Sequence, residues 1–141
     1  VDSIHKELGL VMWDNVGMAR TKESLEKALK EIARVEKIFW SDLRIPGDAD
    51  TLNIELEKAL RLLDFIEIGK LMAYDALNRE ESCGGHFREE HQTEEGEAKR
   101  DDENYSYVAC WKYTGQGQEP ELIKEDLNYQ YIKVQQRNYK N

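Results

Sequence analysis

The feature that most constrains the fold is the spacing of the apolar residues between Ile4 and Leu77. They recur three or four residues apart in three successive stretches, which is the period of an amphipathic helix. The first stretch predicts a helix over about 3–16. The second predicts a helix that begins after Thr21, a good N-cap residue, and carries its apolar stripe to Leu43.

The third helical stretch follows a turn predicted at 46–48, where proline and glycine end the second helix. Asp50 or Thr51 is expected to cap its start. Its later half is apolar on more than one face, whereas a surface helix needs a single stripe. We therefore expect neighbouring elements, or a domain absent from this chain, to cover that half.

Three helices longer than the average of about 11–12 residues, joined by short loops, predict an antiparallel three-helix bundle. We expect this bundle to be spectrin-repeat-like, with an up-down-up course, over residues 1–80. Leu29, Ile32, Leu60 and Leu63 are the positions expected to be buried between the second and third helices.

Beyond residue 104 the period changes to two, which is the period of a strand. A strand is predicted over 105–113, a glycine-rich turn over 114–118 and a returning strand over 122–125. The fold class is therefore mainly α, with a C-terminal β-hairpin and an extended tail whose tyrosines we expect to pack. Residues 105–141 are assigned to the same domain as the bundle, and 81–104 form an acidic connecting segment.

The charge of the chain excludes some partners. Its 141 residues carry a formal net charge of -9, which argues against nucleic acid and against an anionic membrane surface. Ten acidic and four basic residues lie in 79–103 alone. That segment is either a solvated loop or a face that meets a basic partner.

The sequence shows no apolar run near the about 20 residues of a membrane span, and no signal peptide. Cys83 and Cys110 are too few for a disulfide scaffold, so reduced thiols in a cytoplasmic compartment are expected. Because the chain opens with Val1 directly into a helical pattern, we expect a fragment of a longer protein.

The segment 81–90 concentrates the chemistry of the chain. Cys83, His86, His91 and Cys110 are potential zinc ligands, but the two histidines are five apart and the spacing favours polar loop residues instead. Catalysis by Cys83 with a nearby histidine is disfavoured because the surrounding carboxylates raise a thiol pKa.

The glycine pair in this segment follows a helix, so a helix C-cap is favoured over a phosphate cradle, which needs a helix N-terminus. The sequence contains no Gly-x-Gly-x-x-Gly after a strand and no alternation of strands and helices. It therefore predicts no dinucleotide site, no catalytic residue and no metal site within this chain.

Three motifs resemble those of a known family. Segment 81–90 reads Glu-Ser-Cys-Gly-Gly-His-Phe-Arg-Glu-Glu and is similar to the signature Glu-Ser-Arg-Gly-Ala-His-x-Arg-x-Asp of succinate dehydrogenase and fumarate reductase flavoprotein subunits. Segment 12–20 resembles the family's Met-Trp-Asp-x-x-Gly-hydrophobic-x-Arg run, and 100–105 its Arg-Asp-Asp-x-x-aromatic. Cys83 and Gly85 stand where many members have arginine and alanine.

The resemblance implies the C-terminal helical domain of a subunit that binds FAD and interconverts succinate and fumarate. It implies upstream flavin-binding and capping domains that hold the active site, so none of their residues is carried onto this chain and no FAD is expected on it. It also implies an iron–sulfur subunit and, indirectly, a membrane anchor, with the enzyme on the cytoplasmic face of a bacterial membrane.

The composition of the segment suggests a docking role, since glycines permit sharp turns and an arginine fork grips carboxylates or carbonyls. We predict that it contacts the upstream domains and is partly exposed in this chain. The alternative is that Arg88 pairs with Glu81 or Asp101 and serves only this domain. For the chain as a whole, the alternative function is a free-standing acidic helical-bundle interaction domain. The predicted docking motif consists of Glu81, Ser82, Gly84, Gly85, His86 and Arg88.

Overall fold

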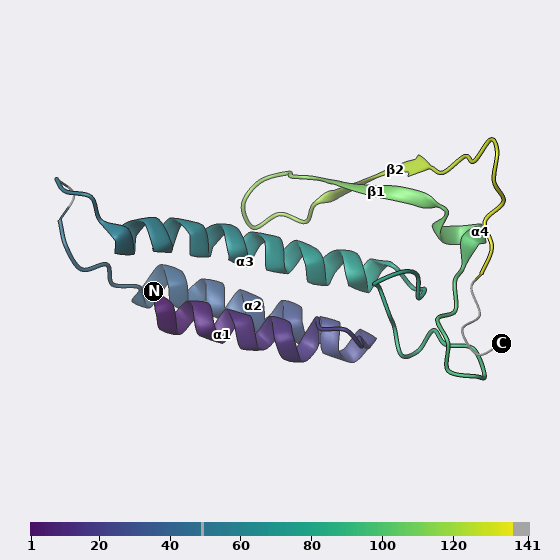
Figure 1. Cartoon of the computed structure of the whole chain (residues 1–141). Helices are drawn as coiled ribbons and strands as arrows, with labels where there is room; N and C mark the ends of the chain where they lie inside the picture. The colour runs from purple at the N-terminus through teal and green to yellow at the C-terminus, as the bar shows by residue number, and fades with distance from the viewer. Residues whose placement is uncertain (49, 137–141) are drawn as a thin grey trace.

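The computed structural model describes residues 1–48 and 50–136, and it confirms the predicted fold class. Three long helices pack side by side and a β-hairpin lies beyond α3 (Figure 1). The bend between α1 and α2 lies at the same end of the bundle as the C-terminus of α3. The elements are α1 Asp2–Asn15, α2 Lys22–Asp42, α3 Ile54–Asn78, α4 Asp102–Tyr105, β1 Tyr107–Lys112 and β2 Glu121–Asp126.

The start of α2 is the predicted one, but the start of α3 is not. Thr21 caps α2 through a reciprocal pair of hydrogen bonds with Ser24, each 3.0 Å. Asn53 caps α3, its side-chain oxygen accepting from the Leu56 N–H at 3.1 Å. Asp50 and Thr51 instead donate their N–H groups to the Asp48 carboxylate, within the turn before the helix.

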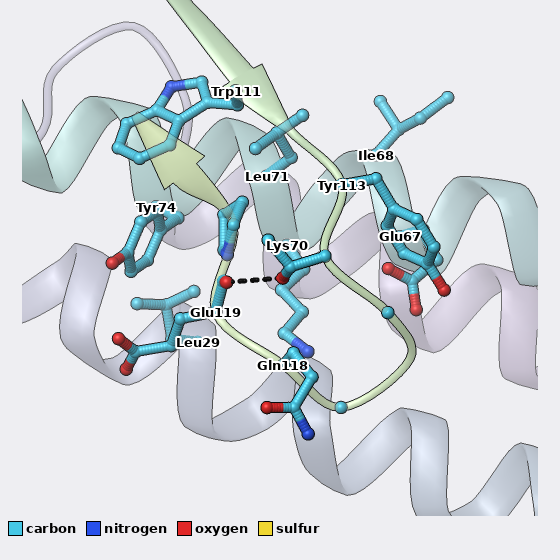
Figure 2. Close-up of a pocket in the computed structure, with 14 residues that line it drawn as sticks. Leu29, Glu67, Ile68, Lys70, Leu71, Tyr74, Trp111, Tyr113, Gln118 and Glu119 are labelled. Carbon is cyan, nitrogen blue, oxygen red and sulfur yellow. Dashed lines mark hydrogen bonds between the residues drawn. The ribbon is translucent and has the colours of Figure 1, made fainter. Parts of the chain in front are cut away.

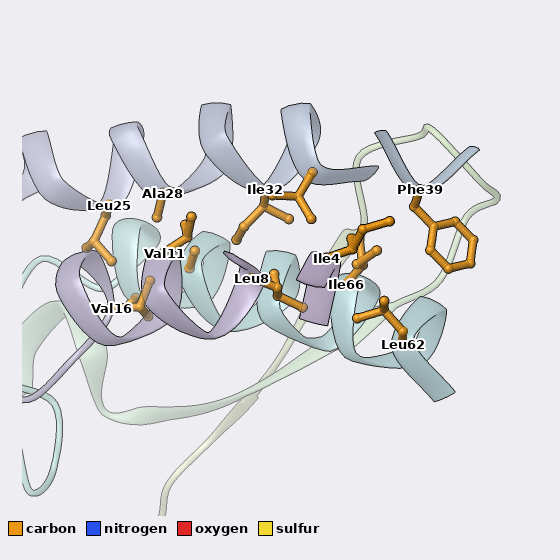
Figure 3. Packing of buried hydrophobic residues seen from close by; sticks show 13 residues of the cluster. Ile4, Leu8, Val11, Val16, Leu25, Ala28, Ile32, Phe39, Leu62 and Ile66 are labelled. Atoms are coloured by element: carbon orange, nitrogen blue, oxygen red, sulfur yellow. The ribbon is translucent and has the colours of Figure 1, made fainter. Parts of the chain in front are cut away.

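The apolar stripes of the three helices meet in one core (Figure 3). Gly69 of α3 provides a close approach to α1, since an added Cβ would lie 3.2 Å from the Met12 sulfur. The hydrophobic effect stabilises this core roughly in proportion to the apolar area removed from water. Its buried members are Ile4, Leu8, Val11, Val16, Leu25, Ala28, Ile32, Val35, Phe39, Leu62, Ile66, Ala73 and Ala76.

The prediction that Leu60 is buried is wrong, because its side chain is 60% exposed. The buried face of α3 runs through Ala59, Leu62 and Ile66, and Leu60 lies on the opposite side of the helix. Since α3 is apolar on more than one face, its sequence did not define the buried one. Of the other predicted positions, Ile32 is fully buried, and Leu29 and Leu63 pack partly buried against the core.

The hairpin pairs β1 with β2 in antiparallel register, from Tyr107 opposite Asp126 to Lys112 opposite Glu121. It contacts α3 through Trp111, whose indole N–H donates to the Asp75 carboxylate at 2.6 Å and whose ring packs edge-on against Tyr74. A cleft of about 380 Å³ separates the loop after β1 from α3 (Figure 2). The hairpin thus covers only part of the outer face of α3.

Parts of the outer face of α3 stay exposed, including Ile68 and Met72. Residues 127–136 form neither helix nor strand, and Tyr129 and Tyr131 are exposed rather than packed. Tyr139, the last predicted tail aromatic, lies outside the described residues. Among the helices of the described residues, none is long and apolar enough to cross a membrane.

Candidate functional site

Segment 81–90 folds back against the bend between α1 and α2, so two of the motifs lie side by side. The Arg20 N–H donates to the Phe87 carbonyl at 3.0 Å, and the Glu89 N–H donates to the Arg20 carbonyl at 2.8 Å. Backbone groups more than sixty residues apart are thereby fixed against each other. This junction, comprising 16–20 and 79–90, is called the motif junction below.

The expectation that the glycine pair caps α3 is wrong. The helix ends at Asn78 with Arg79 as its C-cap, well before the glycines. Cys83 and His86 exchange backbone hydrogen bonds of 2.9 and 3.0 Å around a two-residue turn. Gly84 occupies the first central position with φ +59°, which a glycine adopts without steric cost, as in a type II′ hairpin.

Arg88 performs the capping role instead. Its side chain is 2% exposed, and its guanidinium Nη1 donates to the carbonyls of Ala76 and Leu77 at 3.1 and 3.3 Å. These carbonyls belong to the last turn of α3, where the helix leaves acceptors unsatisfied and the dipole favours a cation. The ion partner of Arg88 is Glu90, at 3.2 Å, and not the predicted Glu81 or Asp101.

Glu81 and Ser82 are also buried, and they join the third motif to the junction. The Glu81 carboxylate accepts from the Arg79 guanidinium at 2.7 Å and from the Asp101 N–H at 2.9 Å. The Ser82 hydroxyl accepts from the Arg88 N–H at 2.8 Å and donates to the Arg88 carbonyl at 3.1 Å. Asp101 in turn caps α4, an element that the sequence analysis did not predict.

His86 is held from both ring nitrogens. Nδ1 lies 2.9 Å from Nη1 of Arg20, and Nε2 lies 2.9 Å from the Arg79 carbonyl. A guanidinium only donates and a carbonyl only accepts, so the neutral ring carries its proton on Nε2. Burial lowers the pKa of His86 below its ordinary value. The hydrogen bond to the Arg79 carbonyl raises this pKa, whereas the charges of the nearby arginines lower it further.

Arg20 is the residue of the junction whose partners the sequence analysis missed. Its Nε donates to the carbonyls of Gly17 and Val16 at 2.9 and 3.2 Å. Within 1–48 and 50–136 it forms no ion pair with a carboxylate. Burial lowers the pKa of Arg20, and Asp75 opposes this from a distance beyond ion-pair contact. In the sequence, the only sign that Arg20 takes part in the site was its position at the end of the first motif.

The exposure of the predicted docking motif is mixed. Gly84 and Gly85 are exposed, and a Cβ added at either would meet open space. Glu81, Ser82 and Arg88, in contrast, are almost completely buried, so the expected partial exposure falls on other residues of the segment. The hydrogen bonds of these three residues all lie within this domain.

The arrangement binds and positions chain segments and offers little acid–base chemistry. Both ring nitrogens of His86 are engaged, and Cys83 and Cys110 are free thiols, the second of them exposed. Across the described part of the chain, no three His, Cys, Asp or Glu side chains converge as metal ligands would. The cleft beside α3 is lined largely by Trp111, Leu71 and other side chains outside the three motifs.

Comparison with known proteins identifies relatives for almost the whole chain. Residues 5–139 match the family model described as fumarate reductase flavoprotein C-term. A fumarate reductase flavoprotein subunit from Serratia is 29% identical over 96% of this chain and 22% of the relative, and that of Escherichia coli K12 is 31% identical over 72% and 16%. The chain thus spans about a fifth of the length of these relatives.

Solved structures show the same architecture. The chain superimposes on the E. coli quinol fumarate reductase FrdA carrying an E245Q mutation with a TM-score of 0.80 and 25% identity, covering 96% of this chain and 22% of that one. A quinol-fumarate reductase with menaquinol molecules gives a TM-score of 0.77 over 93% of this chain.

Proposed function

Since this chain belongs to the family of fumarate reductase flavoprotein C-terminal domains, we propose that it works as part of a subunit that binds FAD and interconverts succinate and fumarate. The domain itself contributes structure and docking. The flavin-binding and capping domains of the same subunit are its immediate partners. An iron–sulfur subunit and a membrane anchor complete the enzyme, on the cytoplasmic face of a bacterial membrane.

The observation that carries the docking role is the motif junction. Arg88 bonds the last turn of α3, and Ser82 bonds the Arg88 backbone. Glu81 is also buried and hydrogen-bonded, so buried groups on both sides position the exposed turn at Gly84 and Gly85. A rigidly held turn without side chains is suited to close backbone contact with another domain. The buried residues of the motif thus position the turn, and the turn makes the contact.

A pair of variants at Gly85 tests this role. An added Cβ meets nothing within 4 Å there and the φ of Gly85 is not positive, so neither Gly85→Ala nor Gly85→Tyr should disturb the melting of this chain. In the full-length subunit, Gly85→Tyr should lower flavin content and fumarate reduction because the ring obstructs the contact. Gly85→Ala should leave both near the original level.

The reading frame and the flavin test the larger proposal. The gene should continue several hundred residues upstream of Val1, and the purified full-length subunit should carry FAD, with absorbance near 450 nm on the order of one flavin per chain. A reading frame that starts close to Val1 would instead favour the free-standing interaction domain. Equal activity of the Gly85→Tyr and Gly85→Ala subunits would contradict the docking role alone.

A further inference from the structure

The surface of the bend between α1 and α2 is built like a binding site for another protein surface. We infer that Trp13, Met18 and Arg20 receive an apolar patch that carries a carboxylate, on the flavin-binding part of the same subunit. This inference rests on the proposed function, whose docking contact at Gly84–Gly85 it extends. It adds which residues of the bend take part and what chemistry they recognise.

The charge of Arg20 is the first observation. Its guanidinium is partly buried and, among residues 1–48 and 50–136, bonds only to neutral groups, namely two backbone carbonyls and the neutral ring of His86. Asp75, the acid that acts on it electrostatically, accepts a hydrogen bond from Trp111 and forms no ion pair with Arg20. Across the described residues, Arg20 is paired with no carboxylate, although the chain carries 29 acidic residues. A partly desolvated cation of this kind favours an anion from outside.

Two exposed apolar side chains at the same bend are the second observation. Trp13, in the last turn of α1, is 82% exposed, and Met18, in the bend itself, is 92% exposed. The buried core of the bundle does not include Trp13. Tryptophan, methionine and arginine are all enriched in protein interfaces, and tryptophan and arginine also among the residues that contribute most to binding.

The rigidity of the bend is the third observation. The Arg20 guanidinium holds the carbonyls of Val16 and Gly17, and the Arg20 backbone pairs with Phe87 and Glu89. Gly17 lies so close to α1 that an added Cβ would be 2.7 Å from the Trp13 carbonyl. A surface fixed before binding loses little entropy when the partner arrives.

Two facts identify the partner. The chain spans 22% of the Serratia relative, so in such a subunit most of the polypeptide lies outside this domain. The hydrogen bond between Arg20 and His86 also makes the bend continuous with the exposed Gly84–Gly85 turn, which we propose contacts that same polypeptide. The bend and the Gly84–Gly85 turn therefore form one surface that faces the flavin-binding part of the subunit, and that part supplies the carboxylate for Arg20.

Oxidative footprinting with hydroxyl radicals and mass spectrometry tests the inference on the intact subunit. Met18 and Trp13 should be modified at least about tenfold more slowly in the full-length subunit than in this chain alone, since buried side chains react only when the contact opens. Trp40, 58% exposed near the far end of α2, is the internal reference. Equal reactivity of Met18 in both samples would overturn the inference.

A substitution distinguishes charge recognition from simple burial. Met18→Glu places a carboxylate two residues from Arg20, where it competes with that of the partner, and it should restore most of the Trp13 reactivity in the full-length subunit. Met18→Leu, the matched apolar control, should keep Trp13 protected. Both should leave the melting of this chain unchanged, because Met18 is exposed.

Three outcomes would count against the inference. If Met18→Glu and Met18→Leu protect Trp13 equally, the carboxylate is not recognised. If this chain alone forms dimers in which Met18 is protected, a second copy is the occupant. A full-length subunit that binds FAD while Trp13 stays reactive refutes this inference only, whereas a subunit without FAD refutes the proposed function.

Discussion

At the scale of single residues, buried Arg88 is the main support of the motif junction. Arg88→Ala leaves the carbonyls of Ala76 and Leu77 and the Glu90 carboxylate without their cation. Each buried polar group left unpaired costs about 1–3 kcal/mol, so the free energy of unfolding should fall by roughly 3 kcal/mol. Denaturant melts of this chain provide the measurement.

The control for Arg88 is an arginine at the surface. Arg61 pairs with Glu57 on the exposed side of α3, where such pairs contribute about 0.3–0.5 kcal/mol. Arg61→Ala should therefore be nearly neutral in the same melts. A change below about 1 kcal/mol for Arg88→Ala would mean that the junction relaxes around the loss.

His86 should make stability depend on pH. Its folded-state pKa lies below the ordinary value of 6.5, so the unfolded chain binds the proton more readily than the folded one. The contribution of neutral His86 to the free energy of unfolding is complete above about pH 6.5. It falls as the pH drops through that value and levels off below the folded-state pKa. Melts from neutral pH down to about 5 should show this loss, and His86→Gln should flatten it.

The sequence identified these residues but not their partners. Motif spacing singled out Arg88 and His86, because such residue types in one short run are conspicuous. Their partners come from other parts of the chain. Arg88 bonds backbone carbonyls of Ala76 and Leu77, and His86 contacts the Arg20 side chain; no local pattern in the sequence marks these groups as partners. The role of a carbonyl in capping depends on where a helix ends, and the end of α3 at Asn78 lacked a glycine signal.

At the scale of elements, the two sides of α3 differ in their energetic importance. Leu62 is 1% exposed and Leu60 is 60% exposed, so Leu62→Ala should cost about 2–5 kcal/mol and Leu60→Ala less than about 1. Urea melts of the two variants decide this. Comparable losses at the two positions would mean that the register of α3 differs from the one described.

The helices and the hairpin were predictable because period is a local property of sequence. An apolar residue every three or four positions favours a helix, and this signal is read from the segment itself. The buried face of α3 was not predictable, since choosing between two apolar faces requires knowledge of the neighbours. The short helix α4 could not be predicted from an apolar repeat, because its four residues complete barely one turn.

At the scale of the whole molecule, this chain alone should be catalytically silent. It lacks a dinucleotide-binding fold and a convergent set of catalytic groups in the part that the structure describes. The purified chain should be colourless and should not reduce fumarate with an artificial donor. Stoichiometric flavin on the isolated chain, seen by its absorbance, would refute this.

The backbone pairing of Arg20 with Phe87 and Glu89 closes a ring that contains α2 and α3. The ring can be opened at its far end, where the bond between Arg44 and Ile45 is exposed to trypsin. Cleavage there leaves two pieces, one with α1 and α2 and the other with α3 and the hairpin. The shared core and the backbone bonds at the opposite end should keep these pieces associated, so the nicked protein should elute from gel filtration at its original volume. Mixing the separated pieces should regenerate it, which makes this domain a candidate for fragment complementation.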